Sequence, residues 1–158
     1  SFYNNTIINS AEFQFKNIYD SYVANNVFVF TDGSTIAYDL DNKSRGNVFE
    51  NNCYYNVMTP LIDLKAMNTV PGFAGDDTSD VLSYVLSKDS PLIGAGVKVD
   101  DGITTDFFGN EITSNNIGCY GGDGTDAEYK GENIFEKLLR MIKNIMETLI
   151  HEIVVIFD

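Results

Sequence analysis

The chain has 158 residues, and its 10 basic side chains against 23 acidic ones give a formal net charge of −13 at pH 7. A hydrophobic share of 44% is typical of a globular protein, and one domain of this length buries about two-thirds of the surface that its unfolded chain exposes. The acidic balance argues against a nucleic-acid partner, because proteins that bind nucleic acid neutralise its phosphates with a basic surface.

An asparagine pair recurs three times within residues 1–58. The stretches FYNNTIIN, YVANNVFVF and VFENNCYYN align Asn4–Asn5 with Asn25–Asn26 and Asn51–Asn52. Similarity at a period of about 20–50 residues indicates stacked repeats, and because the units are β-rich without a helical period, we expect stacked β-coils. The pairs are predicted to be structural rather than sugar-binding: asparagine tolerates the left-handed backbone of a sharp bend, and equivalent amides hydrogen-bond along a stack.

Residues 59–124 are punctuated by three prolines and by many glycines and aspartates. The stretches GDDTSD (75–80) and VDDGITTD (99–106), like Asp39 and Asp41 before them, offer the clustered carboxylates that calcium prefers, although without the spacing of an EF-hand. Turn aspartates that bond their own backbone explain the same pattern. Calcium is therefore the candidate cofactor, with no ligand set assigned.

Residues 125–158 differ in character from the rest of the chain. A polar linker, GTDAEYKGEN, leads into IFEKLLRMIKNIMETLIHEIVVIF, whose apolar residues recur at helical spacing. We expect an amphipathic α-helix that caps the last coil, with self-association through a coiled coil or a surface-lying anchor as alternatives. The charges along the segment argue against a transmembrane helix. The single histidine, His151, is expected on its exposed polar face.

Several stretches resemble a known family. PGF (71–73), LSYVLSKDSPLIGAGV (82–97), TDFFGNEI (105–112) and NIGCYGG (116–122) resemble the closing segment of right-handed parallel β-helix proteins, the fold of the pectate lyases and related secreted polysaccharide-active proteins. The asparagine-pair stretches resemble the coils of the same family. The chain departs from the family pattern at Gly94 and at Cys119–Gly121. The resemblance implies an all-β, right-handed parallel β-helix in residues 1–124, followed in residues 125–158 by the linker and a C-terminal amphipathic α-helix.

The same resemblance implies a function. The chain is expected to be the C-terminal part of a secreted or surface bacterial protein that acts on or binds a polysaccharide, because three coils make a short solenoid. A lyase-like or glycosidase-like activity would have its catalytic groups upstream, and since no catalytic motif is matched, whether the chain is an enzyme stays open. An acidic polysaccharide is the partner that this implies. The alternative is a non-catalytic structural or adhesive β-helix of the surface or spike type, with the helix as an assembly element.

Four residues are candidates for carbohydrate contact. Lys43 and Arg45 lie in the loop DNKSRGN between the second and third repeats, where they offer positive charge to a uronate. Tyr54 and Tyr55 are adjacent in an expected strand, so they point to opposite faces and at least one faces outward. Solvated charges and surface tyrosines without a function are the simpler interpretation.

Two cysteines, Cys53 and Cys119, are expected to be small buried thiols, as free cysteine commonly is. A disulfide between them is the alternative and requires an oxidising compartment. Asn4 and Asn42 fit the glycosylation sequon, a short pattern that also occurs by chance.

Overall fold

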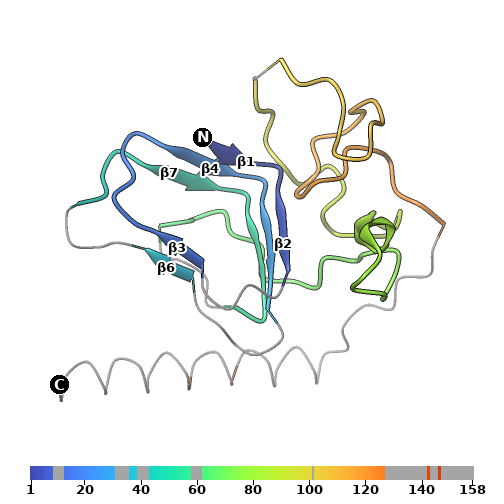
Figure 1. The fold of residues 1–158 in the computed structure, drawn as a ribbon, viewed down its shortest axis with the longest axis horizontal. Coiled ribbons are helices and arrows are strands. Elements are labelled where there is room, and N and C mark those ends of the chain that lie inside the picture. The colour runs from blue at the N-terminus through green and yellow to red at the C-terminus, as the bar shows by residue number, and fades with distance from the viewer. Residues whose placement is uncertain are drawn as a thin grey trace.

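The computed structural model describes residues 1–8, 13–30, 36–38, 43–57, 62–100, 102–126, 142 and 146. Short strands in this part of the chain form three small parallel sheets (Figure 1). The first sheet has the order β1 (Phe2–Tyr3), β4 (Tyr22–Ala24) and β7 (Val48–Glu50), the second has β2 (Thr6–Ile8), β5 (Val27–Val29) and β8 (Cys53–Tyr55), and the third pairs β3 (Phe13–Phe15) with β6 (Ile36–Tyr38).

The strands pair in the register that the asparagine repeat predicts. Thr6 pairs with Val27, and Val27 pairs with Cys53, so equivalent positions of the three repeats lie side by side. The first asparagine of each pair bends the chain from the first sheet into the second. These residues have φ angles of 56° at Asn4, 55° at Asn25 and 53° at Asn51, in the left-handed region that asparagine tolerates better than most residues.

The second asparagine of each pair forms a ladder of side-chain amides along the stack. The Nδ2 of Asn5 donates to the Oδ1 of Asn26 at 2.9 Å, and the Nδ2 of Asn26 donates to the Oδ1 of Asn52 at 2.8 Å. Each accepting Oδ1 also takes the backbone N–H of the preceding asparagine, at 3.1 and 2.9 Å. The prediction that these amides are structural and hydrogen-bonded to one another is confirmed.

Aromatic rings fill the space enclosed by the strands. Phe28 of β5 and Tyr54 of β8 are fully buried and stack with their centroids 5.3 Å apart and their planes 7° apart. Phe15 and Phe49 meet edge to face at 5.1 Å. Burial of a phenylalanine side chain contributes about 1.5–3 kcal/mol, so this cluster is a principal source of stability.

The segment from residue 62 to residue 126 has little regular secondary structure. Its helical element is the 3₁₀-helix η1 (Val81–Tyr84), capped by the carboxylate of Asp80, which accepts the N–H of Leu82 at 3.0 Å. In Figure 1 the turns of this segment lie beside the strand region. A second core cluster joins the two parts, because Leu92 and Ile117 of the turn segment pack with Val27 of the strands.

The predicted right-handed parallel β-helix is wrong. Within the described residues the sheets do not close into a solenoid. The third sheet pairs β3 with β6, and beyond β8 the parallel pairing is reduced to isolated bridges, which join Phe49 to Asp63, Cys53 to Met67 and Ser87 to Thr125. The physical reason lies in the composition that follows the repeats. Pro71 has no N–H for a further ladder, and the glycines and aspartates after it favour turns over strands.

The predicted C-terminal amphipathic helix is also not seen. Of residues 125–158 the described part of the structure includes only Thr125, Asp126, Ile142 and Met146, and two separated positions do not define a helix. The rest of the segment, His151 included, lies outside the described residues, so the division at residues 124 and 125 stays a prediction. Among the described residues there is no helix with the length and apolarity to cross a membrane.

Candidate functional site

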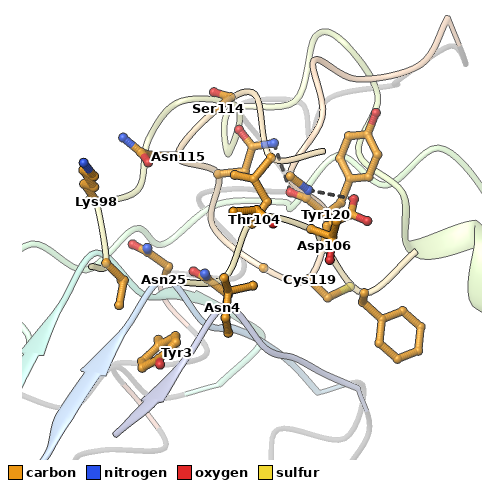
Figure 2. Close-up of a pocket in the computed structure, with 18 of the residues that line it drawn as sticks. Tyr3, Asn4, Asn25, Lys98, Thr104, Asp106, Ser114, Asn115, Cys119 and Tyr120 are labelled. Carbon is orange, nitrogen blue, oxygen red and sulfur yellow. Dashed lines mark hydrogen bonds between the residues drawn. The ribbon is translucent and has the colours of Figure 1, made fainter. Parts of the chain in front are cut away.

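A cavity of about 430 Å³ lies between the strand ends and the turns of residues 97–121. Figure 2 shows Asn4 and Asn25, which follow β1 and β4, at the ends of the strands and close to the turns that carry Thr104 and Ser114. Amide and hydroxyl groups therefore line the cavity from both sides. The asparagine-pair repeat builds one wall, and the turn-rich segment builds the other.

The turn segment is fixed to the strands through left-handed asparagines. The Nδ2 of Asn25 donates to the carbonyl of Val97 at 2.7 Å, and the N–H of Val97 donates back to the Oδ1 of Asn25 at 2.9 Å. In the neighbouring repeat the Nδ2 of Asn51 donates to the carbonyl of Ala95 at 2.9 Å. Residues 95–97 thus lie along the first asparagines of the second and third repeats, and Asn25 is only 2% exposed.

The motif NIGCYGG makes a second connection between the walls. The N–H of Gly118 donates to the carbonyl of Asn25 at 2.7 Å, and the N–H of Cys119 donates to the hydroxyl of Thr6 at 3.1 Å. Gly118 has a φ of 106°, and a Cβ at this position would lie 2.9 Å from the Thr6 hydroxyl oxygen. Only glycine allows this close approach, so the sequence sets the width of the cavity here.

Two of the three first asparagines have a side-chain oxygen without a partner in the described part of the chain. Asn4 and Asn51 have the same left-handed conformation as Asn25, yet the Oδ1 of each is buried without a hydrogen-bond partner among the described residues. Native proteins pair the large majority of buried polar atoms with protein or ordered water. Because the Oδ1 of Asn4 is a buried atom, it is not open to a group that occupies the cavity.

Asp106 holds together the turn that forms the far wall. Its carboxylate accepts the N–H groups of Phe108 at 2.9 Å and Asn110 at 2.8 Å, and that of Gly121 at 3.1 Å. Burial by itself raises the pKa of Asp106, but N–H donation from these backbone groups outweighs it, and the net pKa is lowered. The carboxylate is therefore ionised near neutral pH, and its hydrogen bonds stabilise the turn.

The rest of the lining is mixed in charge and partly apolar. The lining includes one lysine, Lys98, and two carboxylates, Asp106 and Glu111, so the cavity has no excess of positive charge. Phe107 is 68% exposed and offers an aromatic ring at the cavity. Within the described residues no three His, Cys, Asp or Glu side chains come together to hold a metal ion.

None of the four predicted contact residues lines this cavity. Lys43 and Arg45 are exposed, and the Arg45 guanidinium lies 5.4 Å from the centroid of the Tyr19 ring. Tyr54 is fully buried, which leaves it no surface for a saccharide, whereas Tyr55 is partly exposed, as the alternation of a strand requires. Contact through Lys43, Arg45 or Tyr55 stays a prediction.

Sequence reasoning missed Asn4, Asn25 and the turn residues as members of one site. The repeat identified both asparagines as bend residues, and that interpretation holds, but a bend residue also carries a side chain that projects from the stack. The sequence did contain a signal for the first asparagines. Each repeat has two asparagines, and a single ladder along the stack uses only the second, so the first is left for another contact.

The acidic clusters behave as turn residues where the structure describes them. Asp77 accepts the N–H and the hydroxyl of Ser79, at 2.9 and 2.7 Å, and Asp80 caps η1. Asp39, Asp41 and Asp101 lie outside the described residues. The carboxylates of Asp77 and Asp80 have hydrogen-bond partners in their own turns without a metal ion. Calcium binding stays a prediction.

Neither of the two cysteines forms a disulfide in the structure. Cys53 is fully buried in the second core cluster, and Cys119 lies at the cavity wall, where burial raises its pKa. The expectation of two small buried thiols is confirmed for Cys53, whereas Cys119 is only partly buried. The raised pKa keeps Cys119 in its protonated form near neutral pH.

No known protein family matches the chain, and no curated protein matches it either. The resemblance to the pectate-lyase-like family is therefore corrected on two grounds: the comparisons do not support it, and the sheets do not close into the family's solenoid. The motifs that suggested it are turn and bend signals, which several β-rich architectures share.

Proposed function

We propose that this chain is a non-catalytic carbohydrate-binding module and that the cavity beside Asn4 is its saccharide site. The observation that carries the proposal is the lining of the cavity, where Thr104, Ser114 and Asn115 place hydroxyl and amide groups around a space of about 430 Å³. Such a cavity places hydrogen-bond acceptors and donors at fixed positions, as a polyhydroxylated ligand requires.

Two features of the lining support a sugar over other small ligands. Thr104 and Ser114 contribute hydroxyls and Asn115 an amide, all of which both donate and accept. The exposed ring of Phe107 provides an apolar face against which the C–H face of a sugar ring packs. The cavity thus combines polar and apolar contacts on the scale of a sugar unit.

Binding without catalysis is favoured by the state of Asp106, the half-buried carboxylate of the lining. A general acid or base needs a pKa near the working pH, whereas three backbone N–H groups stabilise the ionised form of Asp106 and lower its pKa. This carboxylate is committed to its turn and is a poor proton donor or acceptor. The lyase-like and glycosidase-like alternatives have no support from this group.

The test is a calorimetric titration of the protein with a panel of neutral and uronate-containing oligosaccharides. The variant is Phe107→Ala, and the matched control is Leu82→Ala, since Leu82 is 62% exposed and lies outside the cavity. We expect Phe107→Ala to weaken binding by about tenfold, the loss of a stacking contact of about 1 kcal/mol or more, while Leu82→Ala binds as the parent does. Absence of binding across the panel would refute the proposal.

A rigid structural or adhesive role is the second candidate. It is favoured by the amide ladder, which runs through three repeats and ends on a buried carboxylate, because such a column stiffens the strand stack. A protein that binds no saccharide of the panel but loses most of its stability when the ladder is broken would support this role.

A further inference from the structure

We propose that the outer edge formed by β1 and β2 is an interaction surface, and that it takes an extended polypeptide segment which carries an asparagine and lies parallel to the two strands. Among the described residues β1 pairs with β4 alone and β2 with β5 alone, so both are the outermost strands of their sheets (Figure 1). Edge strands are the places where a further strand is added to a sheet. The surface is separate from the proposed saccharide site, because Asn5 at its centre does not line the cavity.

Asn5, which lies between the two edge strands, repeats the ladder bonds of Asn26 except on one side. The backbone N–H and the Nδ2 of Asn5 donate to the Oδ1 of Asn26 at 3.1 and 2.9 Å, as those of Asn26 donate to the Oδ1 of Asn52 at 2.9 and 2.8 Å. The Oδ1 of Asn26 thus accepts two donors, whereas the Oδ1 of Asn5 accepts none from the described residues. Asn5 is partly exposed, and unlike the Oδ1 of Asn4 this oxygen is not buried, so an incoming donor reaches it.

The second hydrogen of the Asn5 side-chain amide shows the same incomplete pattern. The Nδ2 of Asn26 donates to the carbonyl of Phe2 at 3.0 Å, and the Nδ2 of Asn52 donates to the carbonyl of Val23 at 3.0 Å, so each amide reaches back to the strand of the preceding repeat. The Nδ2 of Asn5 donates instead to the carbonyl of Tyr3 at 2.9 Å, within its own repeat. A docked segment therefore offers Asn5 a backbone carbonyl as well as two N–H donors.

The residues that flank the ladder indicate which segment fits. In the second and third repeats, the residue three before the ladder asparagine and the residue two after it have hydrophobic side chains that are buried: Val23 and Phe28, then Phe49 and Tyr54. The corresponding residues of the first repeat, Phe2 and Ile7, pack against the same core but are only partly buried. A segment with hydrophobic side chains at these two positions continues the interface that β4 and β5 already make with β1 and β2.

A second copy of this chain is a less suitable occupant. In a twofold pair of edges, two Asn5 side chains face each other with the same acceptor oxygen, and the backbone N–H of each is already bonded to Asn26. Head-to-tail stacking fails for a similar reason, since the other end of the ladder is the Asp63 carboxylate, which accepts and does not donate. The occupant therefore brings its own donors, and the second and third repeats show that an asparagine supplies them.

The experiment is an NMR titration of the whole chain with a synthetic peptide that has the sequence of residues 22–30, YVANNVFVF, flanked by lysines for solubility. The test peptide has Asn26→Ala, which removes the Nδ2 donor opposite Asn5 and leaves the protein unaltered. The control peptide has Asn25→Gly, since glycine tolerates the left-handed bend and the first asparagine takes no part in the ladder. All the peptides have the same lysines, so attraction to the acidic chain is common to them. A spin label at either end of the peptide reports its direction.

We expect saturable shifts of the backbone signals of residues 2–8, with binding weakened about tenfold by Asn26→Ala and unchanged by Asn25→Gly. A label at the N-terminus of the peptide is expected to broaden the signal of Phe2, and one at the C-terminus that of Ile8, as parallel pairing requires.

The inference is overturned if the peptide does not bind at residues 2–8, if Asn26→Ala has no greater effect than Asn25→Gly, or if the two labels give the reverse pattern. It is also overturned if a second copy occupies the edge, which light scattering would show as the mass of a dimer and dilution as shifts at residues 2–8. Saccharide binding in the cavity is measured separately, so the failure of either proposal leaves the other standing.

Discussion

Asp63 follows Asn52 in the ladder, at the position where the next asparagine would lie, and its carboxylate accepts hydrogen bonds from Asn52. The Nδ2 of Asn52 donates to the Oδ2 of Asp63 at 2.7 Å, and its backbone N–H lies 3.4 Å from the same oxygen, the pattern that links each asparagine of the ladder to the next. The hydroxyl of Tyr54 adds a third donor to this oxygen at 3.1 Å. Because a carboxylate accepts and does not donate, the ladder ends at Asp63.

Removal of this carboxylate is expected to destabilise the fold. In Asp63→Ala the hydroxyl of Tyr54 loses its acceptor in the buried core, and the amide of Asn52 keeps only its bond to the carbonyl of Val23 at 3.0 Å. Each group left without an acceptor costs about 1–3 kcal/mol. We expect the free energy of unfolding to fall by about 2–4 kcal/mol in urea titrations, and by less in Asp63→Asn, which retains an acceptor oxygen. Asp76→Ala at an exposed turn is the control. Equal stability of Asp63→Ala and Asp76→Ala would show that the ladder needs no terminal acceptor.

The left-handed bends give a prediction that separates backbone strain from side-chain bonding. Asn56 has a φ of 54° and is expected to tolerate glycine with little change, whereas Asn56→Ala keeps the Cβ but loses the polar side chain that lets asparagine adopt the left-handed region, at a cost of about 1–2 kcal/mol. Thermal unfolding of the two variants measures the difference directly. A Gln14→Ala variant on the exposed face of β3 controls for a general effect of alanine. If glycine and alanine at residue 56 are equally stable, the bend is not held in this conformation.

Acid sensitivity is predicted at the network of Tyr22, Glu50 and Lys65. The hydroxyl of Tyr22 donates to Glu50 at 2.6 Å and the ammonium of Lys65 donates at 2.9 Å, and together they lower the pKa of Glu50 below its ordinary value of 4.5 against the opposing effect of burial. The same environment raises the pKa of Tyr22 to about 12, first through burial and then through the Glu50 carboxylate.

The sign of the pH effect follows from the lowered pKa. Above the ordinary value of 4.5 the ionised Glu50 contributes its full stabilisation, and this contribution is lost as the pH falls through the lower pKa of the folded state. The unfolding free energy of the parent chain is therefore expected to fall more on acidification than that of Glu50→Gln. Glu111→Gln at an exposed position is the control. Parallel curves for the parent and Glu50→Gln would contradict the assignment.

The part of the fold that the sequence predicted is the part set by local chemistry. Asn5, Asn26 and Asn52 were recognisable as stacking residues because a bend and a ladder require the same side chain at each repeat. The alternation of Tyr54 and Tyr55 followed from the geometry of a single strand. Closure into a solenoid was predicted wrongly, since bend residues specify where the chain turns and not how many strands each sheet recruits.

The candidate site was hidden from sequence reasoning for a different reason. The contact between Asn25 and Val97 joins residues 72 positions apart, and the contact between Thr6 and Cys119 joins residues 113 positions apart. Such long-range packing depends on the whole core and leaves no periodic signal in the chain. Lys43 and Arg45 were chosen for their charge and their loop, and the cavity formed at other loops.

The most direct test of the account is a ¹H–¹⁵N NMR titration of the whole chain with neutral oligosaccharides, in which the side-chain amide signal of Asn4 and the backbone signals of Gly118 and Cys119 are followed. The account predicts saturable shifts at these three residues, with the signals of Arg45 and Tyr55 unmoved. Saturable shifts centred on Arg45 and Tyr55, or no shifts with any saccharide, would contradict it.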